Sequence, residues 1–486
     1  MLMSYYILND LEPKNFFKWF GAISQIPRGS GNEREIMDFI MDFAVRRGYP
    51  CERDSAGNVF VTVSGTPGYE HEPPVLLQAH VDMVWEKKED VVFDFETEPL
   101  RLKIQNDRLM AEGTSLGADN AVGVATMLAL ADSHNIVHPP LELLFTVEEE
   151  IGLIGIRKFD MSRIRARRML NMDCGSIDTI CVSSAGSVRF ELSQNYSVYN
   201  LPEGYRGLEL KIGGGRGGHS AIMINKGRMC AVNSLAALIQ SSSDHCLLAS
   251  LSVTGSAILD NCSAVLALPE NRYDEILSEM IRNFEIIKAL YAEADPDIYL
   301  SLEAVETKEL HVLSAEISKD LISILGILRT GPYRHNAANP DDVITSASIT
   351  GLSLDKGSFH MTCVIRSSSD IDADNLFHNF RSIAEKFGLH IHLSDRYPGW
   401  PEKMDSGFRD LFRQAYVKMT GREPIYERIH GGVEIGIIAG AIPDMDAVGY
   451  APTSHGAHTA DEYLLISTVQ PFWDVLTDVL SKKEKT

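Results

Sequence analysis

The chain has 486 residues, enough for two or three domains of ordinary size. Its composition is 44% hydrophobic and 23% charged, with 37 Gly and 20 Pro, which fits a globular protein and excludes a disordered chain, a collagen and a coiled coil. The 45 Lys and Arg against 67 Asp and Glu give a net charge of −22, which argues against nucleic acid or an anionic membrane as a partner.

The N-terminal region shows no signal peptide, because Asn9 and Asp10 interrupt its first apolar stretch. No window reaches the roughly 18 apolar residues of a membrane span, so we expect a soluble, cytoplasmic protein. The seven Cys are scattered, odd in number and without a CxxC pair, which disfavours both a disulfide framework and a thiolate metal site. A metal ion in this protein would be held by His and carboxylates.

Helix and strand patterns alternate in the first part of the chain. Residues 12–47 predict two helices around the loop PRGSGNE, in which residues 30–32 could cap the second helix. Short apolar runs predict strands at 58–63, 75–79, 141–147 and 169–172, and a helical stretch covers 119–133. This alternation indicates an α/β sheet.

The texture of the chain changes after Ser184. The segment GLELKIGG, a Gly-rich loop, a helix from Gly227 and a helix over 271–292 indicate a second α/β unit that continues to about residue 392. A helix over 406–420, the segments GGVEIGIIAG and DMDAVG, and a last helix from Tyr463 follow. We interpret residues 396–486 as a return to the first domain.

Three of the predicted strands run directly into ionisable residues. VLLQAH ends in His80, LELLFTV is followed by residues 148–150, all Glu, and MLNMD ends in Asp173. Ligands of open α/β sheets bind at the carboxyl ends of the strands, so we expect these side chains to converge. Asp119, where a loop enters a helix, and His458, in a Gly-containing loop, could face the same crevice.

The resulting set of oxygen and imidazole donors suits one or two zinc or manganese ions, and its members are His80, Asp119, Glu150, Asp173 and His458. A pair of metal ions needs a bridging carboxylate, for which Asp119 is the candidate. Asp82 lies on the same side of the strand as His80 and can accept its second imidazole N–H. One of the adjacent glutamates can bind metal while its neighbour accepts a proton from water.

Each residue alone also has a purely structural explanation. A glutamate run often solvates a helix start, Asp119 could be a helix N-cap, and Asp173 could be a turn residue. A histidine after a strand is more often structural than a metal ligand. The order and local contexts of the five residues together favour a metal site.

The motifs LLQAHVDMV, GTSLGADNAVGVA, TVEEEIGLIG, NMDCGS and HTADE resemble those of the dinuclear zinc metallopeptidases related to carboxypeptidase G and aminoacylase. Within that family the chain is most similar to the aminoacyl-histidine dipeptidases, over nearly its whole length. The resemblance implies that His80, Asp119 and Asp173 bind one zinc ion, and that Asp119, Glu150 and His458 bind the other. It also implies that Mn²⁺ or Co²⁺ could substitute for zinc.

The resemblance assigns further roles around the metal ions. Asp82 would orient His80, and Glu149 would be the general base that activates the bridging water and then protonates the leaving amine. This register pairs Glu149 and Glu150 with the following Ile-Gly, and Glu148 falls outside the site.

The resemblance also implies an α/β fold: a catalytic domain with an open mixed sheet flanked by helices, at residues 1–186 and 396–486, interrupted by an α+β lid domain at 187–395. His219 in GGRGGHSA would then stabilise the oxyanion of the tetrahedral intermediate, and Arg366 would bind the C-terminal carboxylate of the substrate. Asn261 and Gly432 resemble substrate contacts of the family. The glycine loop lacks the Lys-Ser/Thr of a phosphate-binding loop.

The sequence thus predicts a cytoplasmic zinc dipeptidase that cleaves unblocked dipeptides, including Xaa-His substrates such as carnosine, by attack of a metal-bound hydroxide. A tripeptidase or an N-acyl amino acid amidohydrolase would share every metal residue, and a non-catalytic homologue would bind metal or a partner without turnover. Only turnover requires Glu149. The sequence leaves open whether the protein is a monomer or a homodimer.

Overall fold

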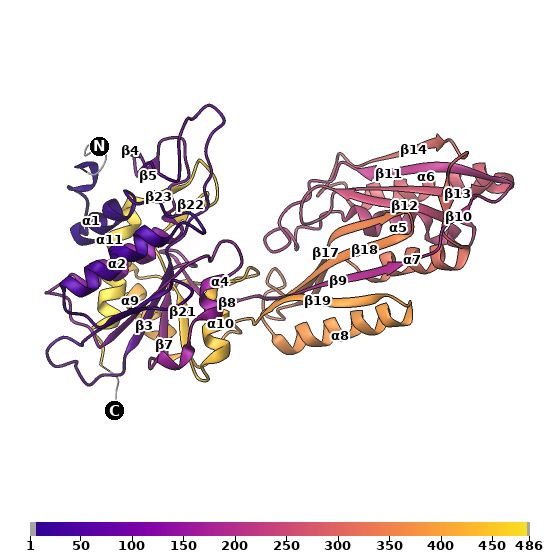
Figure 1. Cartoon of the computed structure of the whole chain (residues 1–486). Coiled ribbons are helices and arrows are strands. Elements are labelled where there is room, and N and C mark those ends of the chain that lie inside the picture. Colours follow the sequence, from indigo (N-terminus) through magenta and orange to yellow (C-terminus); the bar gives the residue numbers. More distant parts are fainter. Residues whose placement is uncertain (1–5, 484–486) are drawn as a thin grey trace. The chain divides into compact units, whose positions relative to one another are not determined.

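Two units with separate hydrophobic cores make up the computed structural model, which describes residues 6–483 (Figure 1). Unit 1 comprises the described residues of Met1–Ser183, Trp400–Ile429 and Val433–Thr486. Unit 2 comprises Ser184–Gly399 and His430–Gly432. The assignment of these units as catalytic and lid domains stays a prediction.

The main sheet of unit 1 has the strand order β1-β2-β6-β3-β7-β21-β8-β20 among the described residues. Its strands are β1 (Cys51–Arg53), β2 (Val59–Val63), β3 (Val75–His80), β6 (Leu141–Thr146), β7 (Arg168–Asn171), β8 (Thr179–Ser184), β20 (Ile425–Ile429) and β21 (Asp446–Gly449). β3 runs parallel to β6 and β7, whereas β2 is antiparallel to β6 and β21 is antiparallel to β8. The sheet is therefore mixed, as predicted, and its central strands β3 and β6 are buried throughout.

Helices flank this sheet, again as predicted. They are α1 (Lys14–Ile23), α2 (Arg34–Arg46), α3 (Ala118–Ala131), α4 (Ile154–Lys158), α9 (Gly407–Thr420), α10 (Glu434–Ala441) and α11 (Val469–Leu480), with short 3-10 turns η1 (Tyr6–Leu8), η2 (Met161–Arg163) and η5 (Ile466–Thr468). α3 packs closely on β3, because a Cβ at Gly123 would lie 2.6 Å from that of Ala79. Since side chains alternate along a strand, Gln78 and His80 point to the opposite face of the sheet.

Three local predictions are wrong. The helix expected from Gly227 begins only at Ala231. Tyr463 begins no helix but the short strand β23 (Tyr463–Leu465), in a small sheet with β22 (Ser454–His455), β4 (Leu102–Gln105) and β5 (Arg108–Ala111). The last helix begins at Val469. Residues 30–32 do not cap α2, whose N-cap is Glu33 without a side-chain cap bond. The Ser30 hydroxyl instead donates to Asp82 Oδ2 over 2.8 Å.

Unit 2 is an α+β unit around a largely antiparallel sheet of order β14-β11-β13-β12-β17-β18-β9-β19, with β16 paired to β17, among the described residues. Its strands are β9 (Gly186–Asn195), β11 (Tyr205–Gly213), β12 (Leu247–Thr254), β13 (Asn261–Pro269), β14 (Tyr299–Val305), β16 (Gly331–His335), β17 (Val343–Asp355), β18 (Ser358–Ser367) and β19 (His390–Tyr397), with the separate pair β10 (Tyr199–Asn200) and β15 (His311–Val312). Its helices are α5 (Ala231–Ile239), α6 (Tyr273–Leu290), α7 (Ala315–Ile327) and α8 (Asp370–Lys386), with 3-10 turns η3 (Gln240–His245) and η4 (Glu270–Arg272).

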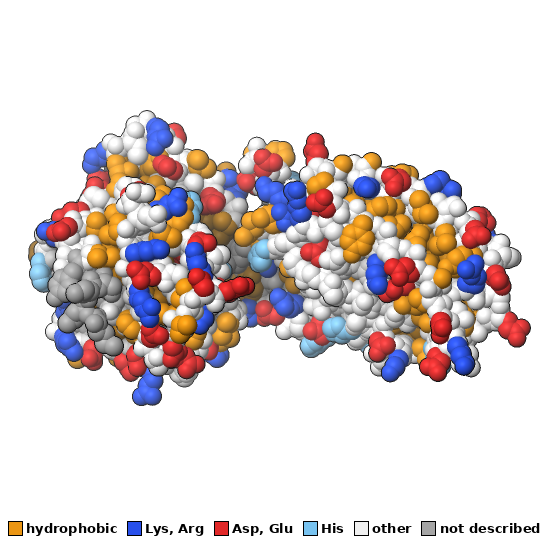
Figure 2. Space-filling view, turned by 90° about the horizontal axis from the view of Figure 1, so that it is seen from above, with side chains coloured by type: hydrophobic (Ala, Val, Ile, Leu, Met, Phe, Trp, Pro, Cys, Tyr) orange, Lys and Arg blue, Asp and Glu red, His pale blue; other side chains and the backbone are white. Residues whose placement is uncertain are grey.

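Charged side chains are spread over both units. Figure 2 shows acidic and basic groups interspersed with hydrophobic ones on the visible face of each unit. None of the helices in the described part of the chain combines the length and apolarity that crossing a membrane requires.

Candidate metal centre

The five predicted metal ligands lie in unit 1. β3, β6 and β7 are parallel neighbours, so their carboxyl ends open at one edge of the sheet. His80 is the last residue of β3, Glu150 and Asp173 follow β6 and β7, Asp119 is in the first turn of α3, and His458 lies between β22 and β23. At the start of the regular part of α3 the Asn120 side chain accepts the Gly123 N–H over 3.2 Å, so Asp119 is not the N-cap that the structural alternative supposed.

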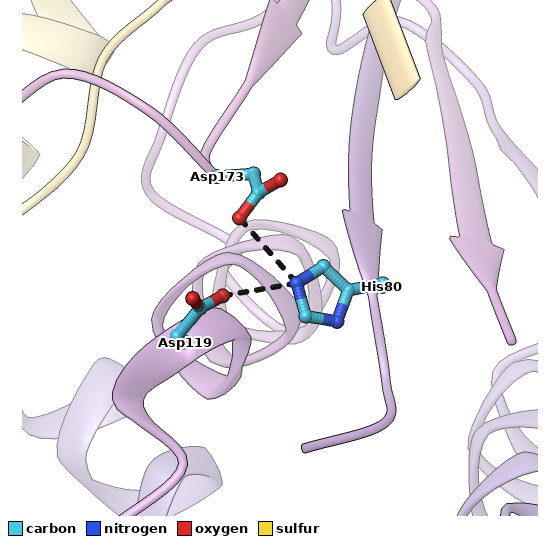
Figure 3. Close-up of side chains that lie close together, drawn as sticks. All are labelled: His80, Asp119 and Asp173. Carbon is cyan, nitrogen blue, oxygen red and sulfur yellow. Dashed lines mark hydrogen bonds and ion pairs between the residues drawn. The ribbon is translucent and has the colours of Figure 1, made fainter. Parts of the chain in front are cut away.

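Asp119 lies between the two histidines. His80 Nε2 is 3.0 Å from Asp119 Oδ1 and 3.4 Å from Asp173 Oδ1 (Figure 3). His458 Nε2 is 3.5 Å from Asp119 Oδ2 and 2.9 Å from Glu150 Oε2. Each carboxylate oxygen of Asp119 therefore faces a different imidazole, which is the geometry that a carboxylate bridging two metal ions needs.

Three overlapping groups could each hold an ion, because one ligand atom from every member lies within 4.8 Å of the others. The groups are His80–Asp119–Asp173, Asp119–Glu150–His458 and His80–Glu149–Glu150. Within the part of the chain described, Glu148 belongs to none of these groups, and it lines a different cavity with Glu33 and Arg34.

The electrostatics of the cluster favour a bound cation. Burial and the nearby negative charge of Asp119 raise the pKa of Asp173. Burial opposes a charge on His80, but the carboxylates of Asp173, Asp119 and Asp82 outweigh it and raise the pKa of the imidazole well above its usual value. Hydrogen bonds to Asp119 and Glu150 likewise raise the pKa of His458 to about 10. Without metal, protons on these histidines supply the positive charge that the carboxylates attract. Bound divalent ions would supply that charge instead, so the residues fit the implied metal ions.

Glu149 lies half-buried beside this cluster. Burial and the charge of Asp173 raise the pKa of its carboxyl group well above the usual value. A carboxylate with raised proton affinity, next to the metal ligands, is suited to accept a proton from water.

Asp82 makes more contacts than the sequence suggested. His80 Nδ1 lies 3.1 Å from the backbone oxygen of Asp82 and 3.4 Å from its Oδ1. The two carboxylate oxygens also accept the backbone N–H groups of Glu149 and Glu150, each over 3.1 Å. Asp82 therefore holds the turn that carries both glutamates as well as lying against the imidazole.

The predicted catalytic residue His219 and the three predicted substrate-binding residues lie in unit 2. His219 is exposed, and its Nδ1 accepts the Ala221 N–H over 3.2 Å. Arg366 Nε donates to the hydroxyl of Ser220, the neighbour of His219, over 3.3 Å. The structure thus brings the His219 loop and Arg366 together within this unit.

The other two substrate residues occupy different surroundings. The Asn261 amide donates to Asp260 over 2.7 Å. Gly432 lies against Tyr397, since a Cβ at this glycine would be 2.2 Å from the tyrosine hydroxyl. A side chain at position 432 would require the tyrosine ring to move.

Sequence reasoning missed Glu434, a buried acid at the start of α10. Its Oε2 accepts hydrogen bonds from Gln78 and, over 2.7 Å, from Thr146, on the face of the sheet to which His80 points. Burial raises the pKa of Glu434 to about 8. The only signal in the sequence is one acid in the apolar segment GGVEIGIIAG.

Sequence reasoning also missed His430, whose Nε2 lies 2.7 Å from the Ser346 hydroxyl. Burial, reinforced by the positive charge of Arg366, lowers the pKa of this imidazole to about 4. His430 is therefore neutral at physiological pH.

Residues 76–482 match the model of peptidase family M20/M25/M40. The chain belongs to this family, which confirms the resemblance seen in its motifs. It is 30% identical to the cytosol non-specific dipeptidase of Escherichia coli, over 98% of this chain and 99% of that one.

Two solved structures share the fold. A crystal structure of aminoacylhistidine dipeptidase from Vibrio alginolyticus has a TM-score of 0.91 and 29% identity, with 99% of this chain and 98% of that one covered. A tripeptidase from Staphylococcus aureus has a TM-score of 0.59 at 14% identity, covering 97% and 98%, and shows a common fold only.

Proposed function

We propose that this protein is a metal-dependent dipeptidase that hydrolyses unblocked dipeptides, Xaa-His dipeptides among them, in the cytosol. The observation that carries the proposal is the position of Asp119, whose two oxygens face His80 and His458, with Glu149 alongside. The full-length similarity to two dipeptidases supports the choice of substrate class.

We assign two zinc ions to the ligand groups His80–Asp119–Asp173 and Asp119–Glu150–His458, with Mn²⁺ or Co²⁺ as possible substitutes. When bound, such ions polarise the scissile carbonyl and lower the pKa of a water molecule toward about 7. Asp82 holds the Glu149–Glu150 turn in place for this chemistry.

Glu149 accepts the proton of the attacking water and passes it to the leaving amine, which its raised proton affinity favours. His219 donates a hydrogen bond to the oxyanion that forms at the carbonyl carbon. Arg366, whose Nε is taken by Ser220, offers its terminal nitrogens to the substrate carboxylate. Asn261 and Gly432 complete the assignment as substrate contacts.

The experiment that tests the proposal combines elemental analysis with hydrolysis of a free Xaa-His dipeptide. About two zinc ions per chain are expected, with activity that chelation abolishes and zinc restores. Metal without hydrolysis of any dipeptide would contradict the proposed function, and absence of metal binding would contradict the site itself.

Substrate range separates the proposal from its alternatives. A dipeptidase should cleave a free dipeptide faster than the same peptide with a blocked N-terminus or an added residue. Preference for the blocked substrate would indicate an N-acyl amino acid amidohydrolase, and preference for the longer one a tripeptidase.

Glu149→Gln tests the general base directly. We expect kcat to fall by roughly 10²–10⁴-fold, because the amide cannot accept the proton. Zinc content should remain that of the wild type. Glu148→Gln is the matched control, because Glu148 is next to Glu149 in the chain but belongs to none of the described ligand groups. This variant should keep the wild-type kcat. Unchanged hydrolysis by Glu149→Gln would remove Glu149 from this role.

A further inference from the structure

Arg28 is a fully buried cation close to the metal ligands but bonded to backbone rather than to their side chains. Its Nη1 donates to the carbonyl oxygen of Val81 over 2.8 Å, with that of Asp82 at 3.4 Å. Its Nη2 donates to the carbonyl oxygen of Gly117 over 2.5 Å. One guanidinium thus links the segment that carries His80 to the segment that carries Asp119.

Glu462 links a third segment to the same place. It is buried, four residues after His458, and its two oxygens accept backbone N–H groups from Gly117 over 2.6 Å and from Asp119 over 3.2 Å. The segment that carries His458 is therefore attached to the backbone of Asp119 itself.

Gly117 is the residue that both side chains hold. Glu462 takes its N–H and Arg28 its carbonyl oxygen. Its φ is +63°, and a Cβ there would lie 2.4 Å from Arg28 Nη2 and 2.7 Å from the sulfur of Met83. The backbone two residues before Asp119 is therefore held at both its N–H and its carbonyl oxygen, and a side chain there would collide with Arg28 and Met83.

Burying two charges is costly, and a buried pair often adds little to stability. Burial lowers the pKa of Arg28 to about 10, and Glu462 is the leading negative charge that opposes this shift. Arg28 donates hydrogen bonds to backbone groups next to metal ligands, and Glu462 accepts hydrogen bonds from such groups. These contacts therefore contribute more to the placement of the metal ligands than to the stability of the hydrophobic core.

We propose that Arg28 and Glu462 are positioning residues that set the separation of His80, Asp119 and His458, and with it the affinity for metal. This inference rests on the metal centre of the proposed function. It predicts that both residues are needed for tight metal binding.

The test uses the full chain, stripped of metal, with zinc as the probe in competition with a chromophoric chelator. Glu462→Gln keeps the size of the side chain but replaces one of the two acceptors with a donor. Arg28→Met keeps the length and removes the donors. The matched control is Glu142→Gln, because Glu142 is another buried acid of unit 1 that accepts backbone N–H groups, those of Arg165 and Ala166, each over 3.1 Å.

Glu462→Gln and Arg28→Met should each weaken zinc affinity by about 10–100-fold, as expected for residues that support metal ligands. Because both act through Gly117, the double variant should lose less than the product of the single losses. Glu142→Gln should bind zinc as tightly as the wild type, even if its metal-free melting temperature falls as far. Arg28→Lys, which keeps the charge, serves if Arg28→Met does not fold.

Wild-type zinc affinity in Glu462→Gln would overturn the inference, as would an equal loss in Glu142→Gln. The readout is metal affinity, so it does not depend on the substrate. If the wild type binds zinc but cleaves no dipeptide, the proposed function fails and the positioning role is still tested.

Discussion

Asp82 accepts hydrogen bonds from two successive backbone N–H groups, those of Glu149 and Glu150, while its own backbone oxygen lies beside His80 Nδ1. A residue with both sets of contacts affects two properties. The contact with the imidazole influences metal affinity, and the contacts with the turn influence where Glu149 lies. The sequence suggested only the first, because the H-x-D spacing concerns a single strand.

Asp82→Ala should therefore weaken zinc affinity by about 10–100-fold and also lower kcat when zinc is saturating. The measurement is a zinc titration followed by kcat at the plateau. Asp54→Ala is the control, since Asp54 accepts the backbone N–H groups of Ala56, Gly57 and Asn58 in a turn of the same unit. Full kcat in Asp82→Ala at saturating zinc would show that the turn does not need Asp82.

The metal ligands could be predicted because each ends a strand or opens a loop in a recognisable motif. Their convergence was expected as well, but the distances between them could not be predicted, since these depend on the parallel pairing of β3, β6 and β7. Arg28, Glu462 and Glu434 escaped sequence reasoning for another reason. Arg28 and Glu462 bond to backbone atoms of distant segments, and Glu434 bonds to Gln78 and Thr146, and no spacing in the sequence marks such partners.

At the scale of elements, α9 and β21 are joined through the carboxylate of Asp446. Ser406 caps α9 by accepting the Arg409 N–H over 2.9 Å, and its hydroxyl donates to Asp446 in β21. Asp446 also accepts the Phe408 N–H over 2.9 Å. The start of the helix is thus fastened to an inner strand of the sheet.

Ser406→Ala should lower the free energy of unfolding by about 1–3 kcal/mol, because it removes a cap and a partner of a buried carboxylate. Urea unfolding measures the difference. Ser369→Ala removes a similar cap from α8, where the hydroxyl accepts the Asp372 N–H over 3.3 Å, and should cost about 1 kcal/mol or less. Equal losses would mean that the contact with Asp446 contributes nothing.

Elements with a clear apolar pattern were predicted well, among them the strands β2, β3, β6 and β7, whereas the three-residue strand β23 was not. α6 lies within the predicted 271–292, and α9 begins one residue after the predicted start. β23 was mistaken for helix because three residues carry no periodicity and its strand character comes from pairing with β5, more than 350 residues earlier, as in Tyr463↔Met110.

At the scale of the whole molecule, His430 makes stability depend on pH. In the folded chain its pKa is about 4, whereas an unfolded histidine has a pKa near 6.5. Between these two pKa values His430 binds a proton in the unfolded chain but not in the folded chain. The contribution of neutral His430 to the free energy of unfolding is therefore complete above about pH 6.5 and is lost as the pH falls toward 4.

Lowering the pH from 7 to 5 should cost the wild type about 2 kcal/mol more than it costs His430→Gln. Urea unfolding of both proteins at each pH, with a chelator present throughout, isolates this difference from metal loss. Identical pH dependence in the two proteins would contradict the assignment of a neutral, half-buried His430.

The order of strands in unit 1 also determines how much of the chain must be synthesised before its main sheet can be completed. β21 (Asp446–Gly449) lies between β7 and β8. The chain must therefore be synthesised as far as Gly449 before this position in the sheet can be occupied. Until then β7 presents an open edge, a site for wrong pairing with other chains. Because His458 follows β21, the last ligand emerges only after every strand of the main sheet of unit 1 has been synthesised. A stalled or truncated translation product would then lack both the finished sheet and the means to capture its metal.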